Sequence, residues 1–403
     1  ETAFTPVDGL AFPQTASIPL DGITGRVARV TMGTTGACDA KLEKAAVVLP
    51  GERPNVPDVE PPELVLFWMI DTLRADHLPI HFETDVEAPN IKRLAEEGAS
   101  FEVAYVQGNE SKTSHASLFS GLYPNRHRVV GKGSLKPPLY LMPEAIRDLK
   151  YDTGAYISNG YVSQPWGFVQ GWDMYRNNLR EGVGGIDGKR MAKSSLPWML
   201  KRKDKKAFMY IGTIDPHVTY RRHEHLIEKY DPEPYKGRFR RACLGTDLGL
   251  IAGKKLAVTE RDKKRIHALY KNEITFNDEA FGWLREQLEE AGIWEKTMVV
   301  ITADHGDQFW ERGGVGHGSG VYQDQVHVPI IFYYPPLIPK GTVVSAGADV
   351  LDIYPTIVDA IGGERPEDLQ GKSLLPLIHK VNGDYPEPAI ATSYKRQYGL
   401  QMH

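Results

Sequence analysis

The run LVLFWMID occupies residues 64–71 and decides the fold class. Its first seven residues are all apolar, as expected of a strand covered on both faces, because a strand with one solvated face alternates apolar and polar side chains. The charged Asp71 follows at once, where such a strand would end. A buried strand that ends in a carboxylate predicts a parallel sheet with polar chemistry at its carboxyl edge.

Strand-like and helix-like segments alternate after this run. Further strands are predicted at residues 154–158, 207–213, 297–302 and 328–334. Helical patterns lie between them at residues 90–97, 143–149, 191–202 and 259–291. Strands separated by helices predict an α/β fold in which helices sandwich a mostly parallel central sheet.

The chain before residue 64 has a different character. Residues 1–49 alternate short apolar runs with Gly, Pro and Thr, which predicts a small β-rich segment. Residues 50–63 are rich in proline and predict an extended linker. The sheet and any site at its edge are therefore expected in a domain over residues 64–403.

The composition is that of a folded globular protein. Of 403 residues, 41% are hydrophobic and 25% are charged, which is enough apolar material for a large core. The net charge of −4 and the absence of a basic stripe give no reason to expect nucleic acid as a partner. No stretch approaches the roughly 18 apolar residues of a membrane-spanning helix, so no transmembrane segment is expected.

The two cysteines leave two alternatives open. Cys38 and Cys243 could form a disulfide in an oxidising compartment or remain two buried thiols, and they are too few for a thiolate metal site. The chain opens at Glu1 without a signal peptide, so we expect that a leader was trimmed before this point. These residues do not decide the cellular compartment; we expect a periplasmic or extracellular location.

Three side chains are candidates for a metal site. Asp71 follows the strand 64–70, and Asp304 and His305 follow the strand 297–302, so all three are predicted at the same edge of the sheet. Two carboxylates and an imidazole suit a divalent cation. Gly306 would let the chain turn away while both preceding side chains face the cleft. The alternative is that an aspartate after a strand only caps a helix or a turn.

A loop that enters a helix carries the candidate nucleophile. The stretch GNESKTSHASL spans residues 108–118, and Ser111 is predicted at or near the helix N-terminus. Free N–H groups and the helix dipole favour an anion there, although a serine at a helix start is often only an N-cap. His217 follows the predicted strand 207–213, and His317 lies in a Gly-rich loop after Asp304 and His305. Both are candidates for holding ester oxygens, protonating a leaving group or completing a second metal site, although a lone histidine is usually a surface or satisfied core residue.

Several motifs in one order resemble a known family. They are FWMIDTLRADHL (67–78), APNIKRLAEEG (88–98), SHASLFSGLYP (114–124), DPH (215–217), TADHGD (302–307), GHG (316–318), VP (328–329), DIYPT (352–356) and GKSLL (371–375). Over about residues 62–380 the chain resembles the sulfatase family of the alkaline phosphatase superfamily. The resemblance implies an alkaline-phosphatase-like fold and an ester hydrolase. Such enzymes commonly continue into a small further sheet, so we expect that the catalytic domain is truncated at His403.

The resemblance also implies a site. It assigns a divalent metal ion to Asp71, Ser111, Asp304 and His305. Ser111 would be both nucleophile and ligand, and His217 and His317 would line the ester group. We expect Lys112 to help stabilise the charge that develops on the ester. Manganese, zinc, calcium and magnesium all remain candidates for the ion.

Two departures from the family pattern bear on the substrate. Thr72 stands where the family often has a second aspartate. Sulfatases use a formylglycine made from Cys, sometimes Ser, in a Cys/Ser-x-Pro-x-Arg context, whereas residues 111–115 read SKTSH without the Pro or the Arg. An unmodified serine could shed phosphate through a phosphoserine but lacks the geminal hydroxyl that releases sulfate. We therefore expect a variant with serine as nucleophile and with phospho-esters favoured over sulfate esters.

Other hypotheses remain open at this point. The protein could transfer a phospho-alcohol group to a glycan or lipid, or it could be a non-catalytic receptor for anionic glycans; its partner would be a small-molecule, glycan or lipid ester. Thr113 is the second choice of nucleophile, and His115 could orient the nucleophile or simply pack. The segment 220–258 is either a wall of the substrate cleft or a plain surface excursion.

Overall fold

The computed structural model describes residues 57–182, 186–379, 389–392 and 398–401. The predicted β-rich segment 1–49 and the first half of the predicted linker 50–63 lie outside these residues. Cys38 lies outside them too, while Cys243 is a buried thiol. The described residues cover most of the domain predicted over residues 64–403.

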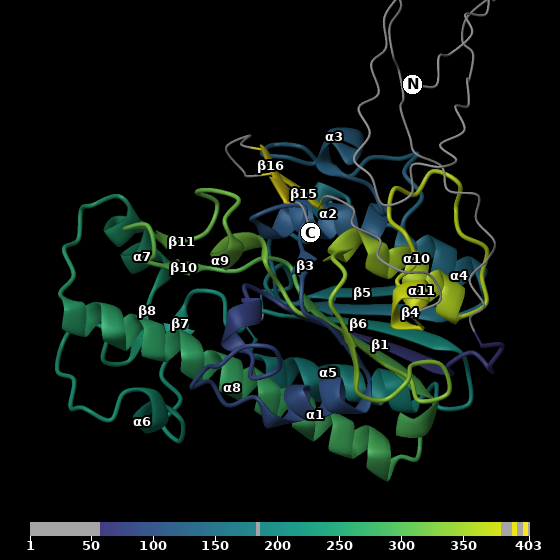
Figure 1. Ribbon diagram of the computed structural model, residues 1–403, viewed down its shortest axis with the longest axis horizontal. Coiled ribbons are helices and arrows are strands. Elements are labelled where there is room, and N and C mark those ends of the chain that lie inside the picture. The colour runs from purple at the N-terminus through teal and green to yellow at the C-terminus, as the bar shows by residue number, and fades with distance from the viewer. Residues whose placement is uncertain (1–56, 183–185, 380–388, 393–397, 402–403) are drawn as a thin grey trace, which may run out of the picture. The chain divides into compact units, whose positions relative to one another are not determined.

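Eight strands form the central sheet of the described residues (Figure 1). In spatial order they are β13 (Thr342–Val344), β2 (Ala99–Phe101), β12 (Ile330–Tyr333), β9 (Thr297–Ala303), β1 (Leu64–Ile70), β6 (Ala207–Thr213), β4 (Asp152–Ile157) and β5 (Met174–Asn177). Every pairing is parallel except the two that β12 makes with β9 and β2. The prediction of a mostly parallel sheet is therefore confirmed, and the predicted strand 328–334 is its antiparallel member.

Helices cover both faces of this sheet, as Figure 1 shows. One face carries α1 (Pro89–Glu97), α5 (Gly188–Leu200) and α8 (Glu260–Glu290). The other carries α2 (Ser111–Ser120), α4 (Met142–Asp148), α10 (Ile353–Ala360) and α11 (Leu375–Ile378). Every residue of β1, β6 and β9 is buried, which explains why the sequence run from residue 64 to 70 is apolar without alternation.

The register of three strands sets the position of the site. β6 and β9 flank β1 and run parallel to it, with Ile70 opposite both Thr213 and Ala303. The three strands therefore end level with one another. The next residue after β1 is Asp71 and the next after β9 is Asp304, so two carboxylates leave the sheet on neighbouring strands.

Shorter elements surround the layers. The helices are α3 (Pro124–His127), α6 (Ile227–Tyr230), α7 (Gly245–Ala252) and α9 (Gln323–Val326). Four strand pairs are β3 (Ala104–Tyr105) with β14 (Ala348–Asp349), β7 (Tyr220–Arg221) with β8 (Ala242–Cys243), β10 (Gln308–Phe309) with β11 (Val315–Gly316), and β15 (Ala389–Thr392) with β16 (Tyr398–Gln401). Within the described residues, no helix is both long enough and apolar enough to cross a membrane.

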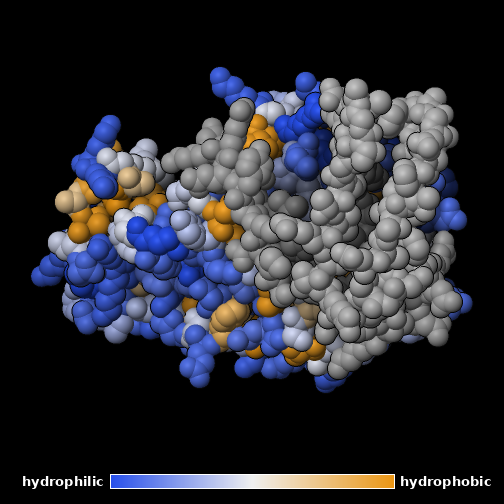
Figure 2. All heavy atoms as spheres, turned by 45° about the horizontal axis from the view of Figure 1, so that its top comes forward, coloured by the Kyte–Doolittle hydropathy of each residue, from blue (hydrophilic) through white to orange (hydrophobic). Residues whose placement is uncertain are grey.

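The segment 220–258 wraps around the first half of α8 and contains α6, α7, β7 and β8 (Figure 1). Arg265 of α8 forms an ion pair with Asp231 at 3.1 Å, which holds the segment to the helix. The segment presents apolar side chains to the surface at α7, seen at the left of Figure 2, where Leu244 and Leu250 are exposed. The inner side of α7 packs through Leu248 against Gly316 of β11.

A buried asparagine joins α8 to the ends of the strands. Asn277 accepts a hydrogen bond from Trp68 Nε1 of β1 at 2.9 Å and donates to Thr213 Oγ1 of β6 at 2.8 Å. Its side-chain amide also donates to the carbonyl of Asp215 at 3.0 Å. One side chain thus satisfies polar groups from β1, from β6 and from the turn after β6.

Replacing this asparagine should destabilise the fold. Asn277→Ala leaves the Trp68 N–H buried without its partner and leaves the Asp215 carbonyl with only the longer hydrogen bond from the Thr213 hydroxyl at 3.5 Å. The loss should cost about 2–4 kcal/mol of unfolding free energy. Urea denaturation followed by circular dichroism measures it. Glu286→Ala, at an exposed position of the same helix, is the control and should change stability by less than about 0.5 kcal/mol. Equal stability of the two variants would contradict the role assigned to Asn277.

Candidate active site

Two carboxylates and an imidazole meet at the carboxyl edge of the sheet. The Nε2 atom of His305 lies 3.7 Å from Oδ1 of Asp71 and 3.8 Å from Oδ2 of Asp304. The side chains of all three residues are buried. The level ends of β1 and β9 bring them together, and the three could hold one ion.

The atoms of this cluster fit a divalent cation. Asp71 Oδ1 and Asp304 Oδ2 are buried and have no hydrogen-bond partner among the described residues. Two ligands of one ion lie about 3–4 Å apart when each is about 2.0–2.5 Å from the ion, which matches the spacing seen here. Burial, and next the negative charge of Asp304, raises the pKa of Asp71 well above its usual value. A cation would remove this cost by neutralising both carboxylates.

His305 is suited to the same task. Burial lowers its pKa to about 4, so that the ring is neutral at pH 7. A neutral imidazole is the form that binds a metal ion through a nitrogen lone pair. Gly306 follows, and a Cβ at this position would lie 2.3 Å from the carbonyl oxygen of Asp324. Glycine is therefore required here for close approach of the backbone, which keeps the turn after His305 tight.

Ser111 lies inside the cluster. It is the first residue of α2, and its Oγ is 3.4 Å from His305 Nε2. The side-chain amide of Asn159 donates to Ser111 Oγ at 2.9 Å and to Asp71 Oδ2 at 2.6 Å. The predicted set Asp71, Ser111, Asp304 and His305 is thus assembled around one point.

Asn159 is a site residue that the sequence analysis missed. It comes two residues after β4, another parallel strand of the sheet. The rule that placed Asp71 and Asp304 at the carboxyl edge would also have placed Asn159 there. An isolated asparagine in a Ser-Asn-Gly turn carries no chemical signature of its own, so only the pairing of β4 with β6 reveals its position.

The start of α2 differs from the expectation of an open anion-binding site. The carboxylate of Glu110 accepts hydrogen bonds from the backbone N–H groups of Lys112 at 2.9 Å and Thr113 at 3.0 Å. These N–H groups are therefore occupied by the helix's own N-cap residue. The expectation of free N–H groups that favour an anion is therefore not met at Lys112 and Thr113, because an acidic cap already satisfies them and places a negative charge at that helix end.

The structure does not bring Lys112 or Thr113 to the cluster. The Lys112 ammonium donates to the carbonyl of Gly131 and lies 3.9 Å from the centre of the Trp166 ring. The Thr113 hydroxyl donates to Glu110 and to the carbonyl of Val129. Successive residues of a helix point about 100° apart, so when Ser111 faces the candidate metal ligands the next two side chains turn away. The expected contribution of Lys112 to the ester charge therefore lacks a structural basis.

His115 lies one helical turn beyond Ser111. Its Nδ1 is 2.7 Å from the Ser111 carbonyl oxygen and 3.6 Å from Asp304 Oδ2. Its ring also makes edge contacts with Phe119 and Tyr210. His115 thus packs in the core and also joins the helical turn of the candidate nucleophile to Asp304, a candidate metal ligand, so it is compatible with both alternatives of the sequence analysis.

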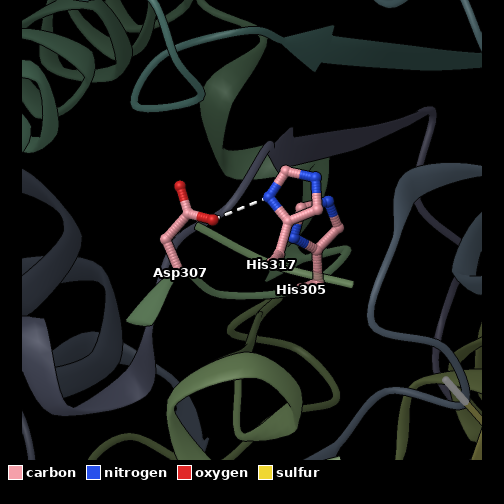
Figure 3. A group of neighbouring side chains, drawn as sticks. All are labelled: His305, Asp307 and His317. Carbon is pink, nitrogen blue, oxygen red and sulfur yellow. Dashed lines mark hydrogen bonds and ion pairs between the residues drawn. The ribbon is translucent and has the colours of Figure 1, made fainter. Parts of the chain in front are cut away.

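His217 and His317 lie beside the cluster. The ring of His317 is 4.2 Å from that of His305 and 5.3 Å from that of His217, measured between centroids. His217 Nδ1 lies 2.7 Å from the carbonyl oxygen of Val218, and His317 Nδ1 lies 2.6 Å from Asp307 Oδ1 (Figure 3). Each ring is anchored through Nδ1, which leaves Nε2 as the nitrogen for a bound ester.

The residue after Asp71 departs from the family pattern and has an uncommon backbone conformation. Thr72 has φ = +63°, which is strained for a β-branched residue. Its N–H donates to Asp304 Oδ1 at 3.1 Å. Its carbonyl accepts a hydrogen bond from the Tyr270 hydroxyl at 2.7 Å. Thr72 thus orients Asp304, a candidate metal ligand, through its backbone N–H and independently of its own side chain.

This fold and this cluster define a class of protein: an ester hydrolase of the alkaline phosphatase superfamily. The sequence pattern of the sulfatase family matches residues 63–363, which is most of the chain. The chain belongs to the sulfatase family.

Relatives and solved structures agree with this assignment. The chain is 22% identical to a sulfatase of Formosa agariphila, over 89% of this chain and 79% of the relative. It is 23% identical to PehA, a multifunctional alkaline phosphatase superfamily protein of Trinickia caryophylli, over 78% of this chain and 76% of PehA. The phosphonate monoester hydrolase of Agrobacterium radiobacter shares the fold with a TM-score of 0.69 and 20% identity, covering 82% of this chain and 80% of its own.

Metal should control the stability of the protein. At a concentration one hundred times its Kd, a divalent ion should add about 3 kcal/mol to the free energy of unfolding, because it binds the folded state alone. Calorimetry with Mn²⁺ or EDTA measures the shift.

Asp71→Asn should stabilise the metal-free protein, since it removes one of two facing buried charges, and should weaken the response to metal. Asp204→Asn, at an exposed position, should behave as the wild type. A metal-free Asp71→Asn protein that is less stable than wild type would contradict this interpretation.

Proposed function

We propose that the protein hydrolyses phosphate-type monoesters with Ser111 as the nucleophile. The observation that carries this proposal is the position of Ser111 Oγ, 3.4 Å from His305 Nε2 and 2.9 Å from Asn159 Nδ2. This hydroxyl lies among the candidate metal ligands, whereas that of Thr113 is engaged elsewhere. A nucleophile must lie within reach of the groups that activate it.

The metal site supports activation of this serine. Asp71, Ser111, Asp304 and His305 would hold the divalent ion. When bound, the ion supplies a Lewis acid that lowers the pKa of the serine hydroxyl and neutralises ester oxygens. Asn159 donates to the same oxygen, which stabilises it as it gains negative charge.

The reaction needs two displacements. The Ser111 hydroxyl loses its proton to solvent and Oγ attacks phosphorus, the bond from phosphorus to the alcohol oxygen breaks, and the alcohol leaves with a proton from His317 or His217. This gives a phosphoserine and a histidine that has lost one proton. Water then attacks phosphorus and gives a proton to that histidine, the bond from phosphorus to Ser111 Oγ breaks, and phosphate leaves as Ser111 regains a proton from solvent. Both histidines are anchored through Nδ1, so Nε2 is the atom that would carry the proton or contact the ester oxygens.

The preference for phosphorus rests on the nucleophile. Serine without the formylglycine context can pass a phosphoryl group to water, whereas a sulfated serine has no geminal hydroxyl to expel sulfate. The phosphonate monoester hydrolase with the same fold supports phospho-ester chemistry on this scaffold. The same scaffold is found in a chain solved with its substrate D-glucosamine-2-N,6-O-disulfate, at a TM-score of 0.69, 20% identity and 85% and 87% coverage of the two chains. A sulfated sugar is therefore the competing substrate class.

A substrate panel tests the proposal. The protein is loaded in turn with Mn²⁺, Zn²⁺, Mg²⁺ and Ca²⁺ and assayed on the nitrophenyl esters of phosphate, phosphonate, a phosphodiester and sulfate. We expect metal-dependent turnover of a phospho-ester, and a loss of about 10³-fold or more in kcat for Ser111→Ala, because no other group forms the covalent intermediate. Thr113→Ala is the matched control and should retain most of the activity.

The contrary outcomes are distinct. Ser111→Ala with most of its activity would refute the nucleophile assignment. Turnover of sulfate alone, together with a Ser111 peptide that mass spectrometry shows to be lighter by a pair of hydrogen atoms, would mean that the serine is converted to formylglycine. An alcohol added to the assay separates hydrolysis from transfer, since a transferase would form the new ester in place of free phosphate.

A further inference from the structure

A buried hydrogen-bonded chain leads from the segment 220–258 to the active site. The Tyr220 hydroxyl donates to Asp307 Oδ2 at 2.5 Å, and the other carboxylate oxygen, Oδ1, is 2.6 Å from His317 Nδ1 (Figure 3). Tyr220 and Asp307 are fully buried. We infer that Tyr220 and Asp307 are positioning residues that orient His317. Through Tyr220, the segment 220–258 would then contribute to ester cleavage. This inference rests on the proposed function, in which His317 meets the ester.

The direction of each hydrogen bond follows from the chemistry of the groups. An ionised carboxylate only accepts, so the tyrosine O–H and a ring N–H of His317 must both donate to Asp307. The proton on Nδ1 is thereby fixed. The ester is met by Nε2, the nitrogen on the far side of the ring. Without Asp307 the ring could take the other tautomer or another rotamer.

A second metal ion is the alternative explanation for His305, Asp307 and His317, whose ligand atoms lie within 4.8 Å of one another. The separation of 2.6 Å between His317 Nδ1 and Asp307 Oδ1 argues against it. Two ligands of one ion are about 3–4 Å apart, as the spacing around His305 and Asp71 illustrates at 3.7 Å. The shorter distance is that of a charge-assisted hydrogen bond.

Tyr220 itself is held rigidly. Its strand pairs with β8, where Cys243 lies opposite. The next residue, Arg221, donates its N–H to Glu273 of α8 at 2.5 Å and accepts from Asn272 at 2.9 Å. The Tyr220 ring packs against Phe309 with centroids 5.8 Å apart. A hydroxyl fixed from several sides can hold the carboxylate of Asp307 in one orientation at little entropic cost.

The chain contains a matched control for this tyrosine. Tyr235 lies in the same segment and its hydroxyl donates to the carboxylate of Asp262, also at 2.5 Å. Its partner lies in the first turn of α8, not at the site. Tyr220→Phe and Tyr235→Phe therefore remove the same kind of hydrogen bond from two places, of which one leads to His317.

Kinetics of the metal-loaded protein are the first test. Tyr220→Phe should lower kcat about tenfold with KM and metal content unchanged, because the substrate still binds while His317 is less well aligned. Asp307→Asn, which keeps the shape but offers an amide, should lower kcat by about 10²-fold or more. Tyr235→Phe should match the wild type. In a His317→Ala background, Tyr220→Phe should have no further effect.

If Tyr220→Phe and Tyr235→Phe lowered kcat by the same factor, the inference would be overturned. It would also be overturned if Tyr220→Phe lowered kcat by the same factor in the wild type and in the His317→Ala background. Proton NMR supplies a readout that needs no turnover. We expect a strongly downfield signal from His317 Nδ1–H that is absent in His317→Ala, moves in Tyr220→Phe and stays in place in Tyr235→Phe. An unmoved signal in Tyr220→Phe would overturn the inference. A wild type that shows the expected signals but cleaves no ester would instead overturn the proposed function alone.

Discussion

The level ending of β1, β6 and β9 is the constraint on which the site depends. Ile70 lies opposite both Thr213 and Ala303, so the residues that follow leave the sheet at one height. A one-residue change in the pairing of β9 would turn the side chain of Asp304 to the other face of the sheet. The register is held by complete burial of all three strands and by Asn277, which joins β1 to β6. The precision of the site therefore comes from the core.

The same arrangement carries a cost in stability. Asp71 and Asp304 are buried and each has an oxygen without a hydrogen-bond partner in the described part of the chain, and Thr72, which follows Asp71, has a positive φ. Features of this kind persist only where surrounding structure enforces them, and they gather at functional sites. Here Asn159 and the Thr72 N–H satisfy one oxygen of each carboxylate, which leaves the others for a cation. A bound cation would therefore offset the cost of burying these two carboxylates.

Long-range packing also brings residues that are distant in the chain to the candidate site. The segment 220–258 wraps the first half of α8, and one of its residues, Tyr220, reaches Asp307 in the turn after β9. His317 contacts Asp307 on one side and lies beside His305, a candidate metal ligand, on the other. The sequence left two equal expectations for this segment, a surface excursion or a wall of the substrate cleft. The contact between Tyr220 of β7 and Asp307 points to a third role, which is support of the His317 side chain.

The sequence by itself determined a mostly parallel sheet between helices and placed Asp71, Asp304 and His305 at its edge, because an unbroken apolar run and a carboxylate after it are local signals of a buried parallel strand. Ser111 was added by the resemblance to the sulfatase family. The sequence could not determine the surroundings of Ser111. The cap formed by Glu110, the turning away of Lys112, and the approach of Asn159 and Tyr220 all depend on helix phase and on pairings between distant segments. Polar side chains carry no mark of their partner in the sequence, since only folding decides which of them are desolvated together. That choice was made by the tertiary structure.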